Sequence, residues 1–423
     1  MRGQLFLILL SVLPLTSCAS AKIVKSAPMD TSKPVSVNTS SREYKEYLKY
    51  FEQVYKTMQA HYYVEPDRKK YEAFLEKFKT KIYANLKSEG KSNNYVRWRA
   101  SWHLLEALKT KEDQFSQFYP PQPAVKFKRE VMGQGVDLGI EGKKMDEGFL
   151  VMRMEPRSDA FKKALQEGDV LLKINGEDVK PLSPQDIEKK LSPEVATKTT
   201  LSYYSAKDKQ EKTIEVVSEE YYKQEVFLRP VAIPGIYCLE IQHFNRTTGE
   251  DLLRFLFVIQ KMNPKGLILD LRGNPGGPPL AAREIASFFL KGGESFAYFQ
   301  RRGQPKIELD VPVIKEQYQV KVPVAILVDQ GSGSCSELFS GVMQFRKRAV
   351  IFGTNTAGQV LLKSTFPLDD GSLMALVTGL GYYPDGARFS FKGITPDQVV
   401  LNAPKQGLIN LAAIYLSQQS LGR

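Results

Sequence analysis

The sequence is poor in cysteine and histidine, and it has no long apolar run beyond its N-terminus. Three cysteines in 423 residues do not make a disulfide framework. Three histidines, with no CxxC pair and no paired-histidine spacing, argue against a zinc site. A polytopic membrane protein is excluded because no internal apolar run reaches about 20 residues. We therefore expect a chain that buries an ordinary core and uses no metal or other cofactor.

The charge is basic but not concentrated. Lys and Arg number 59 against 47 Asp and Glu, a net charge of +12. Such a surface suits nucleic acid, an anionic membrane or a polyanionic cell wall, and the lack of a dense basic tail makes nucleic acid the weakest of these. A solvated basic surface is the plainest interpretation. Hydrophobic residues at 42% and charged residues at 25% exclude a disordered chain, a collagen or a coiled-coil rod.

The N-terminus has the pattern of a secretory signal. Arg2 is followed by the apolar run LFLILLSVLPL, which is typical of a signal peptide. Leu15-Thr16-Ser17-Cys18 resembles a bacterial lipobox, so residues 1–18 are predicted to be a lipoprotein signal and Cys18 the lipidated residue. Ala19 after that cysteine favours the outer membrane over the inner one. A signal peptide with a chance cysteine is the alternative. We expect a lipid-anchored protein of the bacterial periplasm.

Three domains are expected after a flexible tether at 19–42, which is rich in Ser, Thr and Pro. Apolar residues at three- and four-residue steps predict three helices within 43–128. Residues 129–218 read as strand, strand, helix, strand and turn, and GDVLLKINGEDV (168–179) resembles a PDZ domain. In 219–423, apolar strands alternate with helices, which predicts a largely parallel, covered sheet. The fold class is therefore α/β in a mixed α+β arrangement.

PDZ domains bind a peptide C-terminus as an added strand and hold its carboxylate with backbone N–H groups. The resemblance implies that Gly135, Val136, Asp137 and Leu138 form this loop. Asp137 stands where a small residue is usual, so its charge is expected to weaken carboxylate binding. A purely structural PDZ domain is the alternative.

The order of motifs along the chain is specific. LILDLRGNPGG, GSGSCSE, FPLDDGS and GYYPDGARFSFKGITPDQVV follow the helical and PDZ segments. This order resembles that of carboxy-terminal processing proteases, also called tail-specific proteases, over residues 45–402. The resemblance implies a ClpP/crotonase-like serine protease core in the last third of the chain.

Ser334 lies in a turn of small residues between a predicted strand and a predicted helix. Small neighbours let a substrate approach, and the N–H groups of a helix N-terminus can stabilise a developing oxyanion. By resemblance Ser334 is the nucleophile, and the oxyanion donors are the N–H groups of Cys335 and of Gly276, with Gly277 as the alternative. A Cys335 thiolate nucleophile is a weaker alternative. Glu337 is expected to cap the helix.

The base departs from the family pattern. The family lysine stands 25 residues after the serine, where this chain has Gln359, and the family glutamine four residues further on is replaced by Lys363. Positions four apart share one face of a strand, so Lys363 is predicted to be the base and Gln359 its orienting partner. The alternatives are a protein that has lost catalysis and a Ser–His arrangement that uses His243.

The sequence thus predicts a serine endopeptidase that recognises protein C-termini through its PDZ domain and cleaves by acyl-enzyme chemistry. Its expected partners are protein or peptide substrates and the membrane, not nucleic acid. A homo-oligomer and an activating adaptor protein are both compatible with the sequence. The runner-up is a catalytically inactive peptide-binding scaffold on the same fold.

Overall fold

The computed structural model describes residues 8–9, 40–88, 90–132 and 134–421, and the chain divides into two compact units. The first unit contains the chain up to residue 128 with 227–244 and 255–423, and the second contains 129–226 with 245–254. Cys18 and most of the predicted tether lie outside the described residues. Within the described ranges, no helix combines the length and the apolar character that crossing a membrane requires.

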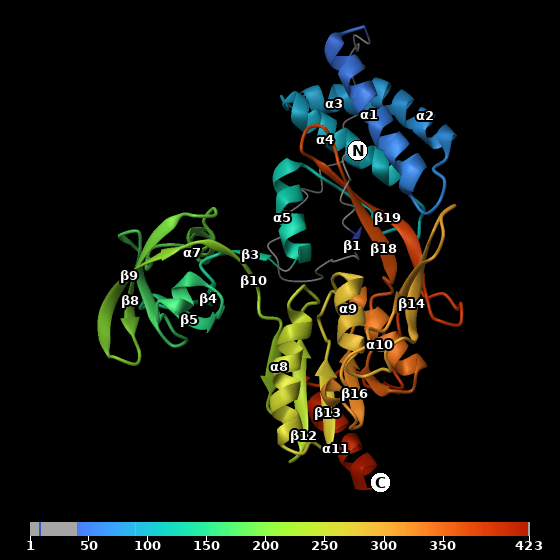
Figure 1. The fold of residues 1–423 in the computed structure, drawn as a ribbon. Helices are drawn as coiled ribbons and strands as arrows, with labels where there is room; N and C mark the ends of the chain where they lie inside the picture. Colours follow the sequence, from blue (N-terminus) through green and yellow to red (C-terminus); the bar gives the residue numbers. More distant parts are fainter. Residues whose placement is uncertain (1–7, 10–39, 89, 133, 422–423) are drawn as a thin grey trace. The chain divides into compact units, whose positions relative to one another are not determined.

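The predicted N-terminal helices are present in the first unit (Figure 1). Ser41 and Ser92 cap the first and last of them, since each side chain accepts a hydrogen bond from the N–H three residues ahead. The second predicted helix contains one π-helical turn. The elements are α1 (Arg42–His61), α2 (Arg68–Lys77), η1 (Phe78–Ile82), α3 (Tyr83–Ser88), α4 (Asn93–Leu108) and α5 (Pro121–Met132).

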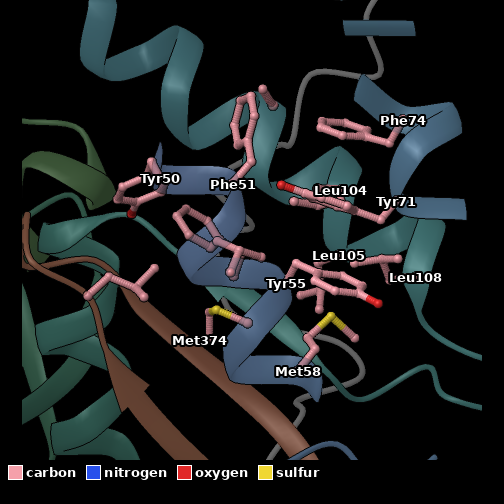
Figure 2. Packing of buried hydrophobic residues seen from close by; sticks show 14 of the residues in the cluster. Tyr50, Phe51, Tyr55, Met58, Tyr71, Phe74, Leu104, Leu105, Leu108 and Met374 are labelled. Atoms are coloured by element: carbon pink, nitrogen blue, oxygen red, sulfur yellow. The ribbon is translucent and has the colours of Figure 1, made fainter. Parts of the chain in front are cut away.

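These helices do not enclose a core of their own. Figure 2 shows the aromatic side chains of α1 and α2 packed with leucines of α4 and with Met374, which lies on a strand. The same cluster includes Leu361, Leu376 and Val377. The segment predicted as a separate helical domain at 43–128 therefore shares one hydrophobic core, and one compact unit, with strands from the C-terminal third.

Those strands belong to an antiparallel sheet in the order β1-β18-β19-β14-β15, with β2 also paired to β19. The short helix η2 (Glu316–Tyr318) follows the last pair. The strands are β1 (Ile8–Leu9), β2 (Gln117–Tyr119), β14 (Ser295–Arg301), β15 (Ile307–Asp310), β18 (Leu361–Pro367) and β19 (Leu373–Tyr382).

The second sheet of the first unit is the predicted covered sheet. Its order is β11-β12-β13-β16-β17-β20, and every pairing from β12 to β20 is parallel. Cys238 on β12 is fully buried and packs with residues of α11, as expected for a core thiol. The strands are β11 (Val226–Arg229), β12 (Ile236–Ile241), β13 (Gly266–Asp270), β16 (Val324–Val328), β17 (Ala349–Gly353) and β20 (Gln398–Val399). The helices are α8 (Thr248–Lys261), α9 (Pro279–Ala286), α10 (Cys335–Phe345) and α11 (Lys405–Leu421).

The second unit has the predicted order except that three strands, not two, precede its first helix. Its main sheet runs β4-β5-β6-β8-β9, with β7 paired to β6, and β3 pairs separately with β10. The strands are β3 (Gln134–Asp137), β4 (Ile140–Lys144), β5 (Phe149–Met154), β6 (Val170–Ile174), β7 (Glu177–Asp178), β8 (Lys198–Ser205), β9 (Gln210–Val217) and β10 (Glu219–Tyr222). The helices are α6 (Asp159–Lys162) and α7 (Pro184–Leu191).

A polar cluster fastens the N-terminal helices to the β18–β19 turn. Asp370 accepts hydrogen bonds from Tyr50 Oη at 2.9 Å and from Trp98 Nε1 at 2.7 Å. Arg97 lies 3.3 Å from the same carboxylate. These donors come from α1 and α4, so one acidic side chain on a turn orders two helices.

We expect Asp370→Ala to lower the free energy of unfolding by about 2 kcal/mol, because it leaves three partly buried donors without their acceptor. Urea unfolding followed by circular dichroism measures the change. Asp369→Ala, an exposed neighbour, is the matched control and should be close to neutral. Equal effects of the two variants would show that the cluster does not anchor the helices.

Candidate active site

Ser334 occupies a strained backbone position between β16 and α10. Its φ is +53° and its ψ is −110°, and it is the residue that caps α10. A non-glycine residue in such a region costs about 1–3 kcal/mol and persists only where its surroundings hold it. The side chain is fully buried, and Oγ has no hydrogen-bond partner among the described residues. The fold thus holds the predicted nucleophile in a backbone conformation that lowers the stability of the protein.

Asn274, in the turn after β13, holds this segment from one side. Its carbonyl accepts hydrogen bonds from Gly333 N–H at 3.0 Å and from Ser336 Oγ at 2.8 Å. Its side-chain amide donates to the carbonyl of Ile241 at 2.7 Å. The sequence analysis missed this residue, although an asparagine in a Gly-Asn-Pro-Gly run is a known former of local side-chain turns.

Glu337 holds the segment from the other side. Its fully buried carboxylate accepts the Ser334 N–H at 2.8 Å, which is the expected capping bond from N3 to the N-cap. The same carboxylate accepts Thr356 Oγ1 at 2.5 Å, Gly358 N–H at 2.6 Å and Gln359 N–H at 2.7 Å. Burial raises the pKa of Glu337, and these hydrogen bonds oppose that shift. One side chain therefore binds the nucleophile to the segment that precedes β18.

The turn that contains Gly276 passes close to the first N–H of α10. A Cβ on Gly276 would lie 2.7 Å from Ser334 Cβ and 2.8 Å from the Cys335 nitrogen, so only glycine permits this approach. The structure thus brings Gly276, Ser334 and Cys335 together, as the sequence analysis predicts. The Gly276 N–H was expected to be an oxyanion donor, but it already donates to Asn274 Oδ1 at 2.8 Å. The Cys335 N–H is the better candidate donor.

The Cys335 thiol does not suit a nucleophile. It is fully buried and donates to the carbonyl of Gly277 at 2.8 Å. Burial raises its pKa, which disfavours the thiolate that would react. Cys238 and Cys335 are both free, so no disulfide joins them.

The expectation that Gln359 and Lys363 share one face of a regular strand is wrong. Gln359 precedes β18, and the Leu361 N–H donates to the Gln359 carbonyl at 2.8 Å in a three-residue turn. The β18–β19 register also shifts between Leu362 and Lys363. The turn breaks the alternation that would have placed both side chains on one face. The Gln359 N–H thus contacts Glu337, which also binds the Ser334 N–H. The Lys363 amine makes no hydrogen bond to this group among the described residues.

Lys363 is fully buried, and its Nζ has no hydrogen-bond partner among the described residues. Burial lowers its pKa to about 8. The charges that act on it are Asp113, which favours the ammonium form, and Lys109, which opposes it. Asp113 follows α4 and accepts hydrogen bonds from Tyr62 Oη and from the Phe115 and Ser116 N–H groups. Lys363 is thus an amine with a pKa suited to a general base, in an environment set by the N-terminal segment.

The segment that carries His243 lies against the nucleophile turn. Phe244 N–H donates to the carbonyl of Gly276 at 2.9 Å, and a Cβ on Gly277 would meet the Phe244 carbonyl oxygen at 1.8 Å. His243 itself is half-buried. The other two histidines, His61 and His103, lie on α1 and α4, where burial lowers the pKa of both. His243 is the histidine whose chain segment borders Ser334.

Comparison with known proteins assigns both domains. Residues 235–400 match the sequence model of peptidase family S41, and residues 124–202 match that of the PDZ domain. The chain therefore combines a peptidase family S41 domain with a PDZ domain.

Relatives with this combination are described as probable CtpA-like serine proteases. The protein from Staphylococcus aureus (strain bovine RF122 / ET3-1) is 26% identical over 326 residues, which cover 76% of this chain and 64% of the relative. That from Staphylococcus epidermidis (strain ATCC 12228 / FDA PCI 1200) is 29% identical over 308 residues, 72% of this chain and 61% of the relative. The chain thus spans less than two thirds of the length of these relatives.

Solved structures share the fold. The photosystem II D1 C-terminal processing protease matches with a TM-score of 0.50 at 19% identity. The match covers 88% of this chain and 98% of the chain of that protease. A putative S41 protease from Bacteroides fragilis NCTC 9343 has a TM-score of 0.52 at 15% identity, with 87% and 97% covered. At these identities the likeness concerns the fold.

We expect Gly276→Ala to lower kcat/KM by about 10²–10³, the usual effect of losing an oxyanion donor. The added Cβ would lie 2.8 Å from the Cys335 nitrogen and block its N–H. Hydrolysis of an unfolded protein measures activity, and circular dichroism checks the fold. Gly273→Ala is the control, because a Cβ there meets no atom within 4 Å. Gly273 also has a positive φ, +70° against +106° for Gly276, so the control places a side chain at positive φ without the steric clash. Unchanged cleavage by Gly276→Ala would contradict the assignment.

Proposed function

We propose that the chain is a lipid-anchored serine endopeptidase of the bacterial periplasm, whose PDZ domain delivers polypeptide substrates. One observation carries the proposal. Ser334 is held at a positive φ at the start of α10, where the turn containing Gly276 passes so close to Ser334 Cβ and the Cys335 nitrogen that only glycine fits. The match of residues 235–400 to peptidase family S41 supports the reaction class.

The reaction would proceed through an acyl-enzyme. Ser334 Oγ attacks the carbonyl carbon of the scissile peptide bond while its proton passes to a base, and the Cys335 N–H stabilises the oxyanion. The proton then passes to the leaving amine as the C–N bond breaks. Water attacks the ester, loses a proton to the same base, and releases the new carboxylate with Ser334 restored.

Lys363 is the first candidate for the base. Its pKa of about 8 leaves a useful fraction of the neutral amine near pH 7–8, and its Nζ is uncommitted among the described residues. Because no hydrogen bond joins Nζ to Ser334, the proposal requires a rearrangement of β18 on substrate binding.

His243 is the second candidate. Its chain segment lies against Gly276 and Gly277, which border Ser334 in the conformation described. Histidine needs no pKa shift to serve as a base near neutral pH.

A catalytically inactive peptide-binding scaffold is the alternative function. Gln359 stands at the lysine position of the family. The lysine that the chain does have, Lys363, is influenced by Asp113, which raises its pKa and so favours the ammonium form. A serine hydroxyl without a neighbouring base is a poor nucleophile.

Variants of the three residues distinguish these proposals. We expect Ser334→Ala to abolish degradation of an unfolded protein, and the variant of the true base to do the same, because residues that act as a unit fail together. If Lys363→Met is inactive and His243→Gln active, Lys363 is the base, and wild-type kcat/KM should fall as the pH drops below about 8. The reverse pattern identifies His243. Wild-type activity equal to that of Ser334→Ala would establish the scaffold.

We expect the wild-type protein to fractionate with membranes and to incorporate a labelled fatty acid at Cys18, since the segment before it resembles a lipobox. Cys18→Ser should lose the label and remain uncleaved or become soluble. The Cys238→Ser variant, which removes a buried thiol, should keep the label. Full labelling of the Cys18 variant would contradict the lipid anchor.

A further inference from the structure

The PDZ domain has an open sheet edge on β4. In the order β4-β5-β6-β8-β9, β4 is terminal, and none of the described strands pairs with its other side. An unpaired edge is the site at which an extended peptide adds as a strand. Peptide binding through backbone hydrogen bonds along β4 is thus available to the second unit.

The end of β4 that should hold a peptide carboxylate is already occupied. Three of the four residues predicted to form that loop, Gly135, Val136 and Asp137, lie in strand β3 and are paired with β10. The Leu138 N–H donates to the carbonyl of Leu191 at 3.0 Å. The Gly139 N–H donates to the Asp137 carboxylate at 2.7 Å. Both N–H groups next to β4 therefore have acceptors within the domain.

Asp137 is held in this position by further contacts. Tyr221 Oη donates to the carboxylate, and the Lys223 ammonium lies 4.0 Å from it. Tyr221 packs so closely on Gly135 that a Cβ there would lie 2.5 Å from its ring. An arriving carboxylate would have to displace an anchored one of the same charge.

Apolar side chains of β4 and α7 also pack against one another in the domain core. A PDZ domain that reads a C-terminus receives the terminal apolar side chain between the strand and the neighbouring helix. Here Ile140 of β4 and Ile187 and Leu191 of α7 are buried together in the domain core, with Leu138 beside them. A peptide laid along β4 therefore finds backbone partners along the strand, but the Leu138 and Gly139 N–H groups at its end already have acceptors.

We propose that the PDZ domain binds internal segments of unfolded polypeptide along β4 and gives no preference to a free C-terminus. The proposal deepens the proposed function by naming its substrate class, and it departs from the sequence-based expectation of C-terminal recognition. Asp137 takes the place that the substrate carboxylate would have, and a continuing chain passes without adding charge there.

The test uses the full chain with Ser334→Ala, so that no peptide is cleaved, and fluorescence anisotropy. Three labelled peptides share one apolar sequence: the first ends in a free acid, the second in an amide, and the third continues for six further residues. We expect the amide and the extended peptide to bind within about twofold of each other. The free acid should bind no more tightly than the other two peptides. At low salt it should bind more weakly than they do, because repulsion from Asp137 is then least screened.

Substitution of Asp137 gives the decisive comparison. Asp137→Ala frees the Gly139 N–H and removes the charge, so the free acid should gain about fivefold or more over the amide. Asp137→Asn keeps an acceptor for that N–H and should give a smaller gain. Asp146→Ala, which removes an exposed acid from the turn after β4, should change neither ratio.

The proposal is overturned if the chain with Asp137 intact binds the free acid about tenfold more tightly than the amide. It is also overturned if none of the three peptides binds. Cleavage of an unfolded protein by the wild type is measured separately. If the wild type cleaves and the free-acid peptide binds much more tightly than the amide, only the proposal of internal recognition is refuted. If the peptides bind as expected and the wild type does not cleave, only the proposed endopeptidase activity is refuted.

Discussion

The buried carboxylate of Glu337 is the interaction on which the site depends. It joins the backbone of Ser334 to Thr356, Gly358 and Gln359, which are separated from it by the whole of α10 and β17. Because a buried carboxylate without donors is costly, these four hydrogen bonds support one another. They tie Ser334 to the segment leading into β18. This makes the positive φ of Ser334 sustainable.

The fold could be read from the sequence where periodicity and small-residue turns dictate local structure. The three N-terminal helices, the PDZ strand order and the covered parallel sheet all follow from such patterns. The separation of 43–128 as a domain does not, because Leu361, Leu376 and Val377 complete its core from more than 200 residues away. Local patterns show that a face is apolar, but not which distant face covers it.

The site was predictable as far as motifs fix backbone geometry. Ser334, Gly276 and Cys335 meet because a strand–turn–helix with small residues can fold in few ways. The relation of Gln359 to Lys363 was not predictable, because the turn at Leu361 and the shifted register of β18 depend on pairing with β19. Asn274 and Asp113 act through tertiary hydrogen bonds and leave little trace in sequence spacing.

The complete burial of Ser334 has a kinetic consequence. A hydroxyl with no exposed surface reacts only from conformations in which its cover has moved away. If Ser334 is acylated as proposed, the acylation rate is the rate of the open form multiplied by the fraction of molecules that occupy it. A ligand that favours the open form would raise turnover without touching the chemistry, and a general serine-directed reagent would label the resting protein slowly.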